Sequence, residues 1–264
     1  MSEVLYNIIR RTKNVYPRQI MRDIVLAEII RNQEKVIMEN NKVLTVKDFK
    51  KDEEVQALIK YTDFQLENLG FTEHSQRHLS IVSSWAKELA EKLDATEREI
   101  RLVEIAGYLH DIGNSINRHD HAMNGAILAY KILTKKGMPY EDACEIMTAI
   151  GNHDENDGYP VSRLAALLII ADKADVHRSR VRYKNRSVEG VKNDIHDRVN
   201  YAVESSYLDV VGDDITLNIT IDTDICSVMD YFEIYLARMK LCGKSAAVFN
   251  KNFKLVINGT ELSN

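Results

Sequence analysis

Apolar residues recur every three or four positions along about the first 200 residues, with charged residues between them. This spacing places apolar side chains along one face of a helix and therefore predicts a largely helical chain. Thr96 and Asp94 offer side chains that can cap a helix start, and Gly70 and Gly137 can end a helix. The chain up to about residue 68 is expected to be helical, with one helix starting near Pro17 and another over 52–69. The further expected helices are 72–92, 96–109, 121–136, 140–152 and 164–174.

Strand patterning begins after about residue 205. Residues 215–221 alternate strictly between apolar and polar, which is the pattern of a half-buried strand. Residues 207–211 precede a turn at Gly212 and are expected to pair with them, while 226–242 again has helical spacing and 253–257 reads as a third strand. We therefore expect a mainly α fold with three regions: N-terminal helices (1–69), a helical domain (70–204) and a small α+β extension of ββαβ type (205–264).

The composition is that of an ordinary globular protein, with 264 residues, 45% hydrophobic and 28% charged residues and a net charge of −5. It excludes a disordered or collagen-like chain, and the mild acidity argues against binding nucleic acid through bulk charge. Residues 164–174 are apolar almost all round, which predicts a buried central helix, and this run is too short to cross a bilayer. Since the N-terminus lacks a signal-peptide layout, we expect a cytoplasmic protein without a membrane partner.

The three cysteines, Cys144, Cys226 and Cys242, are odd in number and far apart in the chain. This arrangement argues against a disulfide framework and favours a reducing compartment. Each cysteine is therefore expected to be a small buried hydrophobe.

An adjacent His110-Asp111 pair ends one of the predicted apolar helices. A buried carboxylate is costly unless it is paired or bound to a metal. Successive helical residues point about 100° apart, so both side chains can reach one ion near the helix end. The pair alone is equally consistent with a simple hydrogen bond between the two side chains.

Further metal-ligating residue types occur along the chain, at His74, His121 and His153 in polar segments and at Asp172 inside the most apolar helix. A carboxylate at that position needs a cation partner, which a metal would supply. Asp175, one turn later, is a candidate for orienting a ligand or Lys173. The remaining histidines are expected to be structural or on the surface: His78, His119, His177 and His196.

The ordered series of these residues, with the motifs YLHDIG and IIADKAD, resembles the HD-domain metal-dependent phosphohydrolase superfamily over about residues 70–182. The resemblance implies an all-helical HD core and a divalent metal cofactor, with two ions and with Fe or Mn favoured over Mg, Co, Zn and Ni. It also implies the metal ligands, of which the last two would serve a second ion: His74, His110, Asp111, Asp172, His121 and His153.

Two departures from the family pattern narrow this expectation. Asn114 stands where many members have a lysine after HDIG. Residues 152–160 are similar to the HHExxDGxGYP stretch of cyclic-di-GMP phosphodiesterases, but Asn152 replaces the first histidine and Asp154 replaces the glutamate. We therefore do not expect that particular activity or a three-metal site.

Cationic residues flank the expected ligands. Arg178 and Arg182 match by spacing the arginine segment of HD-domain endoribonucleases, and Arg77 follows His74 by three residues. Arginine suits bidentate phosphate binding, although alternating arginines can equally form a solvated face. We expect these three arginines to bind substrate, and Asp111 and Lys173 to be catalytic.

The resemblance implies hydrolysis of a phosphomonoester or phosphodiester, of nucleotide type, with a metal-bound hydroxide as nucleophile. The partner expected is thus a small phosphorylated ligand. A second copy of the chain is a further candidate, through the N-terminal helices. Two alternatives stay open, namely a di-iron oxygenase of the same fold and a non-enzymatic ligand-sensing or interaction protein.

Overall fold

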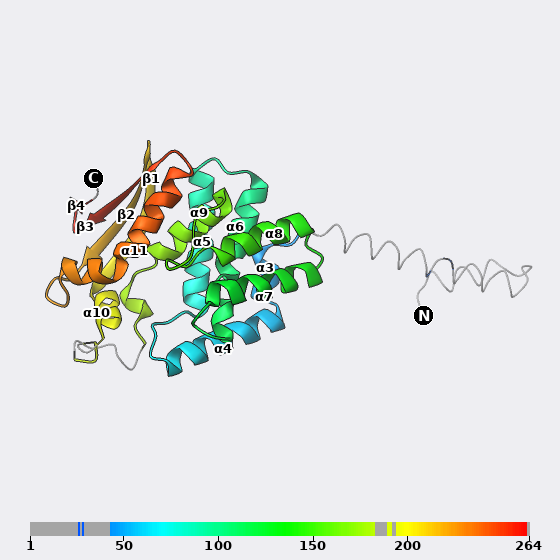
Figure 1. Ribbon diagram of the computed structural model, residues 1–264, viewed down its shortest axis with the longest axis horizontal. Coiled ribbons are helices and arrows are strands. Elements are labelled where there is room, and N and C mark those ends of the chain that lie inside the picture. Colours follow the sequence, from blue (N-terminus) through cyan, green and yellow to red (C-terminus); the bar gives the residue numbers. More distant parts are fainter. Residues whose placement is uncertain (1–25, 27, 29–42, 183–188, 192–193, 263–264) are drawn as a thin grey trace, which may run out of the picture. The chain divides into compact units, whose positions relative to one another are not determined.

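Amphipathic helices form most of the computed structural model, which describes residues 26, 28, 43–182, 189–191 and 194–262 (Figure 1). The mainly helical fold class is confirmed. The helices expected at 52–69, 96–109, 121–136, 140–152 and 164–174 begin and end within one residue of the predicted positions. The helix expected at 72–92 begins at Gln76, the one expected at 226–242 spans Val228–Ala247, and the short helix Ile195–Ala202 was not predicted. The helices expected before residue 43, and their pairing with a second copy, lie outside the described residues apart from Leu26 and Glu28. The helices up to the sheet are α3 (Val46–Lys50), α4 (Glu53–Asn68), α5 (Gln76–Lys92), α6 (Glu97–Leu109), α7 (His121–Lys135), α8 (Tyr140–Gly151), α9 (Arg163–Ala174) and α10 (Ile195–Ala202), with the 3₁₀ turns η1 (Ile112–Ser115) and η2 (Arg178–Arg180).

Local chemistry sets several helix ends. The Thr96 hydroxyl accepts a hydrogen bond from the Glu99 backbone N–H, and the Glu99 carboxylate accepts one from the Thr96 backbone N–H. Gly70 and Gly137 follow helices with φ of 82° and 84°, as a helix-ending glycine should. Asp94 is not a cap, because it occupies the left-handed turn before Thr96 with φ of 51°.

Helix α9 is the centre of the helical part. Its residues from Leu164 to Ala171 are all buried, and α5, α6 and α8 pack around it. A helix that is apolar all round is stable only inside a protein, so the predicted buried central helix is confirmed. Its last turn carries Asp172 and Lys173 into the same interior.

A four-stranded sheet with the order β1-β2-β3-β4 follows the helices. Strands β1 (Val203–Val211) and β2 (Asp214–Ile221) form the expected antiparallel hairpin, while β2 and β3 (Asn252–Ile257) are parallel and joined by helix α11 (Val228–Ala247). The short strand β4 (Thr260–Glu261), which the sequence did not predict, pairs antiparallel with β3.

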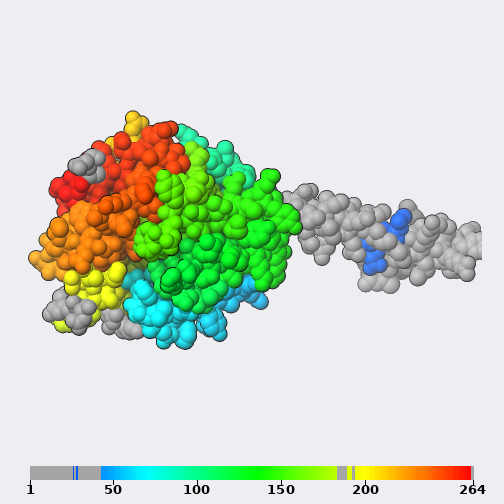
Figure 2. Space-filling view, viewed as in Figure 1, coloured from blue at the N-terminus to red at the C-terminus, as the bar shows by residue number. Residues whose placement is uncertain are grey.

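Helix α11 connects the sheet to the helical part, because it contacts both α9 and β3. Residues 44–264 form one compact unit with a continuous apolar core from Leu44 to Ile257. In Figure 2 the surfaces of the last helix and strands, orange to red, meet those of the green helices without a break. The division at residues 69 and 204 stays a prediction.

The cysteines are free thiols, as expected. Cys226 and Cys242 are buried, but Cys144 is exposed on α8, so the expectation of three buried cysteines was wrong for that residue. Within the described residues, every helix is too short or too polar to cross a membrane.

Candidate metal centre

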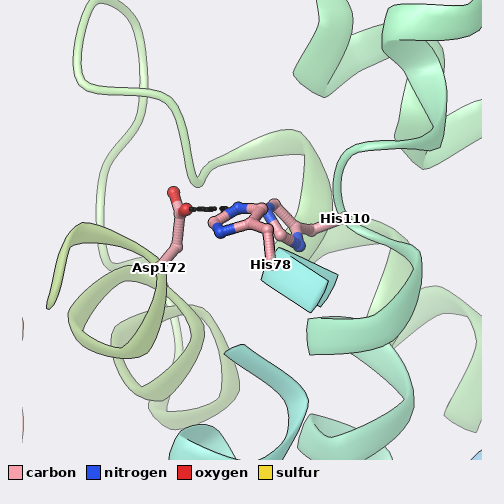
Figure 3. A group of neighbouring side chains, drawn as sticks. All are labelled: His78, His110 and Asp172. Atoms are coloured by element: carbon pink, nitrogen blue, oxygen red, sulfur yellow. Dashed lines mark hydrogen bonds and ion pairs between the residues drawn. The ribbon is translucent and has the colours of Figure 1, made fainter. Parts of the chain in front are cut away.

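Imidazole and carboxylate groups converge where the ends of α5 to α9 meet. The Nε2 atom of His78 lies 3.3 Å from Asp172 Oδ1, and Figure 3 shows these two side chains with His110. The same Nε2 atom lies 3.5 Å from Asp111 Oδ2. The Nε2 atom of His110 lies 3.4 Å and 3.5 Å from the same two carboxylate oxygens. The other carboxylate oxygen of Asp111, Oδ1, lies 3.6 Å from His121 Nε2 and 3.9 Å from His153 Nε2.

The second ring nitrogen of each of these histidines is already occupied. A carbonyl oxygen can only accept, so Nδ1 carries the proton and donates it to the backbone in three of the rings. These bonds join His110 to Gly107 O at 2.9 Å, His121 to Arg118 O at 3.2 Å and His153 to Ile150 O at 2.6 Å. The Nδ1 of His78 contacts the buried Asp175 carboxylate at 2.7 Å. All four rings therefore turn Nε2 toward the carboxylates.

The donor set fits a divalent cation. The Nε2 atoms of His78 and His110 face each other at 3.3 Å beside the carboxylates of Asp111 and Asp172, whose side chains are 3% and 10% exposed. Two Nε2 lone pairs in this arrangement need a cation between them, and a divalent metal would bind both rings and both acids. Two groups each bring three potential ligand atoms within 4.8 Å of one another: His78, His110 and Asp172, and His110, Asp111 and His153.

The electrostatics of the group also favour a positive charge at its centre. Burial raises the pKa of Asp111, but the charge of His110 outweighs it and holds that pKa well below its usual range. Burial lowers the pKa of His110, but the negative charges of Asp111 and Asp172 have a larger effect and raise that pKa to about 10. For His153, burial and the charge of His110 both lower the pKa, to about 3. The two acids thus stay ionised and hold a positive charge between them.

The structure places His78, not His74, in the position expected for the first ligand. His78 is fully buried in the first turn of α5, on the face that also carries Val82 and Ala86. His74 precedes the helix, donates Nδ1–H to Thr72 O, and lies at the edge of the group with its ring 5.3 Å from that of His78. The sequence held one signal for this position. Val82 and Ala86 repeat at four-residue intervals on the buried face of α5, and the same interval leads back to His78.

Lys173 lies beside the proposed ligand Asp172, as expected of a residue at the site. Its Nζ atom is 2.8 Å from Asp172 Oδ2 and 2.7 Å from Glu155 Oε2. Burial lowers the pKa of Lys173, but these two carboxylates outweigh it and raise the pKa above its ordinary value. Lys173 is therefore a fixed cation rather than a proton acceptor. Glu155 also accepts from Arg238 Nε of α11 at 2.8 Å, and the sequence pointed to neither of these residues.

The three arginines predicted to bind substrate point elsewhere, which corrects that expectation. Arg77 pairs with Glu73 at 2.8 Å and Asp175 at 3.2 Å, Arg178 pairs with Glu204 at 3.2 Å, and Arg182 pairs with Asp63 at 3.0 Å. Arg178 and Arg182 flank Arg180, and the turn of the chain there directs only the middle side chain inward. The cations that line the pocket around the acids are Arg118, Lys173, Arg180 and Arg238.

Two polar residues tie these groups together. The Asp175 carboxylate accepts from His78 and from Arg77, and its backbone carbonyl accepts from Arg180, so it holds the ligand ring in place, as expected for that residue. Asn114 donates to Asp111 Oδ1 at 2.9 Å and accepts from Arg118 at 3.2 Å. Asn114, which stands where many family members have a lysine, thus orients the cationic side chain of Arg118.

Comparison with known proteins supports the interpretation of the helical part as an HD domain. Residues 72–177 match the family model of the HD domain. The uncharacterized protein MJ1020 of Methanocaldococcus jannaschii is 26% identical over 155 residues, which are 50% of this chain and 59% of that protein. The chain thus matches little more than half the length of this curated relative.

A solved structure also resembles part of the chain. It is the crystal structure of a predicted HD superfamily hydrolase from an uncultured Thermotogales bacterium, with a TM-score of 0.38 and 21% sequence identity. The superposition covers 51% of this chain and 75% of the other.

Proposed function

We propose that this chain, whose residues 72–177 match the HD-domain family model, is a metal-dependent hydrolase of phosphate esters. One observation carries the proposal. Histidine Nε2 atoms from four helix ends converge on the two buried carboxylates of Asp111 and Asp172, and each ring is fixed by a hydrogen bond at Nδ1. A divalent metal bound there would lower the pKa of a water molecule and polarise a phosphoryl oxygen.

The division of contacts on Asp111 supports two metal positions. Its Oδ2 atom faces His78 and His110, and its Oδ1 atom faces His121 and His153. Asp111 would therefore be shared, with Asp172 completing the first position. His121 Nε2 also lies 3.5 Å from Asp154 Oδ2, so Asp154 adds a carboxylate to the second position.

The surrounding cations support a phosphorylated substrate of small size, such as a nucleotide. Arg118, Arg180 and Arg238 line the pocket, and planar guanidinium groups match phosphate oxygens well. Arg118 is positioned by Asn114, and Arg238 by Glu155. These residues would bind and orient the phosphate next to the acids. The proposed substrate is a phosphomonoester or a phosphodiester.

The test is phosphate-ester hydrolysis by the purified protein across a nucleotide panel, with Mn, Fe, Co, Ni, Zn and Mg each supplied. We expect Asp111→Asn to lower kcat/KM by about 1,000-fold or more, because both metal positions lose a charged ligand. Asp213→Asn is the matched control, since the side chain of Asp213 is 85% exposed in the hairpin turn. Hydrolysis with no metal, or equal activity in Asp111→Asn with unchanged circular dichroism, would contradict the proposal.

A further inference from the structure

Two cavities adjoin the narrow pocket that Asp111, His121, His153 and Asp172 line. The pocket has a volume of 20 Å³, and its neighbours have 540 Å³ and 370 Å³. Both neighbours lie within the range of about 300–1,000 Å³ found for small-molecule sites. The narrow pocket has room for ions, water or phosphate oxygens, but not for an organic group.

The two cavities border the pocket at different residues. The 540 Å³ cavity shares His121 with the pocket, whereas the 370 Å³ cavity shares His74 and Arg238 with it. Among the described residues, Arg118 alone lines all three spaces. A phosphate held at the acids would therefore lie next to both cavities.

The smaller cavity combines an exposed aromatic ring with polar groups. Phe71 lines it, is 40% exposed and lies under the Arg118 guanidinium at 5.5 Å. Tyr235 contributes its edge to the wall, because its ring is buried between the Arg238 guanidinium at 4.8 Å and the stacked Tyr231 ring at 4.9 Å. Asn200 donates to the Tyr235 hydroxyl at 3.0 Å, and its own Oδ1 atom is buried without a hydrogen-bond partner in the described part of the chain. An exposed aromatic ring beside an amide suits a heterocyclic base and its sugar.

The lining of the larger cavity combines charged and amide side chains with Ala122 and Met123. Its polar groups include Arg118, His119, Asp154, Asn156 and Asp157, at the start of α7 and in the loop after α8. Carboxylates and amides exchange hydrogen bonds with hydroxyl groups, so this lining suits an uncharged, hydroxyl-bearing group such as a second sugar.

We infer that the substrate is a phosphodiester, with a nucleoside-like arm in the 370 Å³ cavity and a second, hydrophilic arm in the 540 Å³ cavity. The inference rests on the proposed function. A phosphomonoester has a single organic arm and would leave one cavity unused. In the reaction, the oxygen of water bonds to phosphorus as one P–O ester bond breaks. One proton of the water ends on the departing alkoxide, so the products are a phosphomonoester and an alcohol.

The test compares two esters that release the same 4-nitrophenolate from the Mn²⁺-loaded protein. One is the 4-nitrophenyl diester of thymidine 5′-phosphate, and the other is the monoester 4-nitrophenyl phosphate. We expect kcat/KM for the diester to exceed that for the monoester by about tenfold or more.

Bulky substitutions test the two cavities separately. Met123→Trp and His196→Trp each add a ring at one cavity, and each is expected to lower the ratio of diester to monoester kcat/KM by about tenfold. Ile127→Trp and Leu236→Trp are the controls, because these side chains are exposed and line neither cavity. The controls are expected to keep the ratio of the unsubstituted protein.

A binding measurement gives a readout apart from turnover. Titration calorimetry on the Asp111→Asn protein would compare dithymidine monophosphate, a diester, with thymidine 5′-phosphate. Because only the diester fills both cavities, we expect it to bind about tenfold more tightly.

The outcomes separate this inference from the proposed function. Hydrolysis of the monoester alone, or a ratio that neither Met123→Trp nor His196→Trp changes, would overturn the inference and leave the proposed function standing. Equal binding of the two thymidine compounds would also overturn it. Hydrolysis of neither ester with any of the metals would contradict the proposed function, and the inference with it.

Discussion

At the scale of single residues, one hydrogen bond decides which nitrogen each histidine presents. His110, His121 and His153 all donate Nδ1–H to the backbone carbonyl three residues earlier, at Gly107, Arg118 and Ile150. Gly107 and Ile150 lie in the last turns of α6 and α8, where carbonyl groups lose their helical partners, and Arg118 lies in the segment before α7. The local fold thus fixes each ring and its tautomer together. His78 differs, since a buried side chain, Asp175, takes that role.

The first prediction separates His78 from His74. We expect His78→Ala to lower Mn²⁺ affinity by about 100-fold or more, because a ligand is lost from the buried group. His74→Ala should lower the affinity much less, because His74 lies at the edge of the group. Metal titration with a competing chelator measures both. The opposite order of effects would restore His74 as the ligand.

The second prediction concerns pH. Without metal, burial lowers the pKa of His110, but the negative charges of Asp111 and Asp172 have the larger effect and raise that pKa to about 10. Nε2 therefore carries a proton near neutral pH. A metal must displace that proton, and raising the pH removes the competitor. Apparent metal affinity should therefore rise by about tenfold per pH unit while the pH stays below that pKa. Calorimetry in two buffers of different ionisation enthalpy would detect the proton that metal binding releases. A metal affinity that does not change with pH would contradict the raised pKa of His110.

Sequence reasoning reached most of the residues now seen at the site, and its errors have a common cause. His110, Asp111 and Asp172 stand out because polar side chains interrupt apolar helices. The direction in which a side chain points from a helix start or an extended segment depends on tertiary packing. That is why His74 was preferred to His78, and why Arg178 and Arg182 were preferred to Arg180.

At the scale of elements, two glycines allow η1 and α7 to approach closely. A Cβ atom built on Gly113 would lie 2.0 Å from the His121 carbonyl oxygen and 2.3 Å from the Gly125 nitrogen. No side chain fits there without moving α7. The contact keeps Asp111, which directly precedes η1, within 3.6 Å of His121 at the start of α7.

The third prediction follows from this contact. Gly113→Ala should destabilise the protein by about 2 kcal/mol or more and separate His121 from Asp111, so the second metal position weakens. Gly243→Ala is the matched control, because nothing lies within 4 Å of its Cβ on α11. A helix-interior alanine there should stabilise by about 0.5–1 kcal/mol. Thermal melts with metal titrations measure both, and a neutral Gly113→Ala would refute the close approach.

Elements with a strong local pattern were predictable, and pairings over long distances were not. The helical period and the alternation of residues 215–221 are local, and they placed α9 and β2 correctly. The two-residue strand β4 is too short to carry a pattern. The parallel pairing of β2 with β3 depends on how α11 crosses between them, which no local signal specifies.

At the scale of the whole unit, the C-terminal extension takes part in building the site. Helix α11 packs on α9 and carries Arg238 to Glu155, which in turn contacts Lys173 beside Asp172. Burial lowers the pKa of Arg238, but the charge of Glu155 outweighs it and raises the pKa. No local motif predicts this link, because it joins residues 83 positions apart.

The fourth prediction is that the helical part does not fold without the extension. A chain ending at residue 204 would expose the face of α9 that α11 covers, including the partners of Met239 and Cys242. We expect that chain to be insoluble or to lack a cooperative thermal transition, while residues 44–264 alone should melt cooperatively. A folded chain of residues 1–204 would instead show that the extension is an independent domain.

The central claim is that this chain binds divalent metal at the buried histidines and acids, and metal content tests it most directly. Plasma mass spectrometry on protein purified without chelator or oxygen should find about two equivalents of Fe or Mn per chain. His121→Ala should retain about one equivalent, and Asp111→Asn should retain about none. No bound metal in the unsubstituted protein, even after reconstitution, would contradict the account.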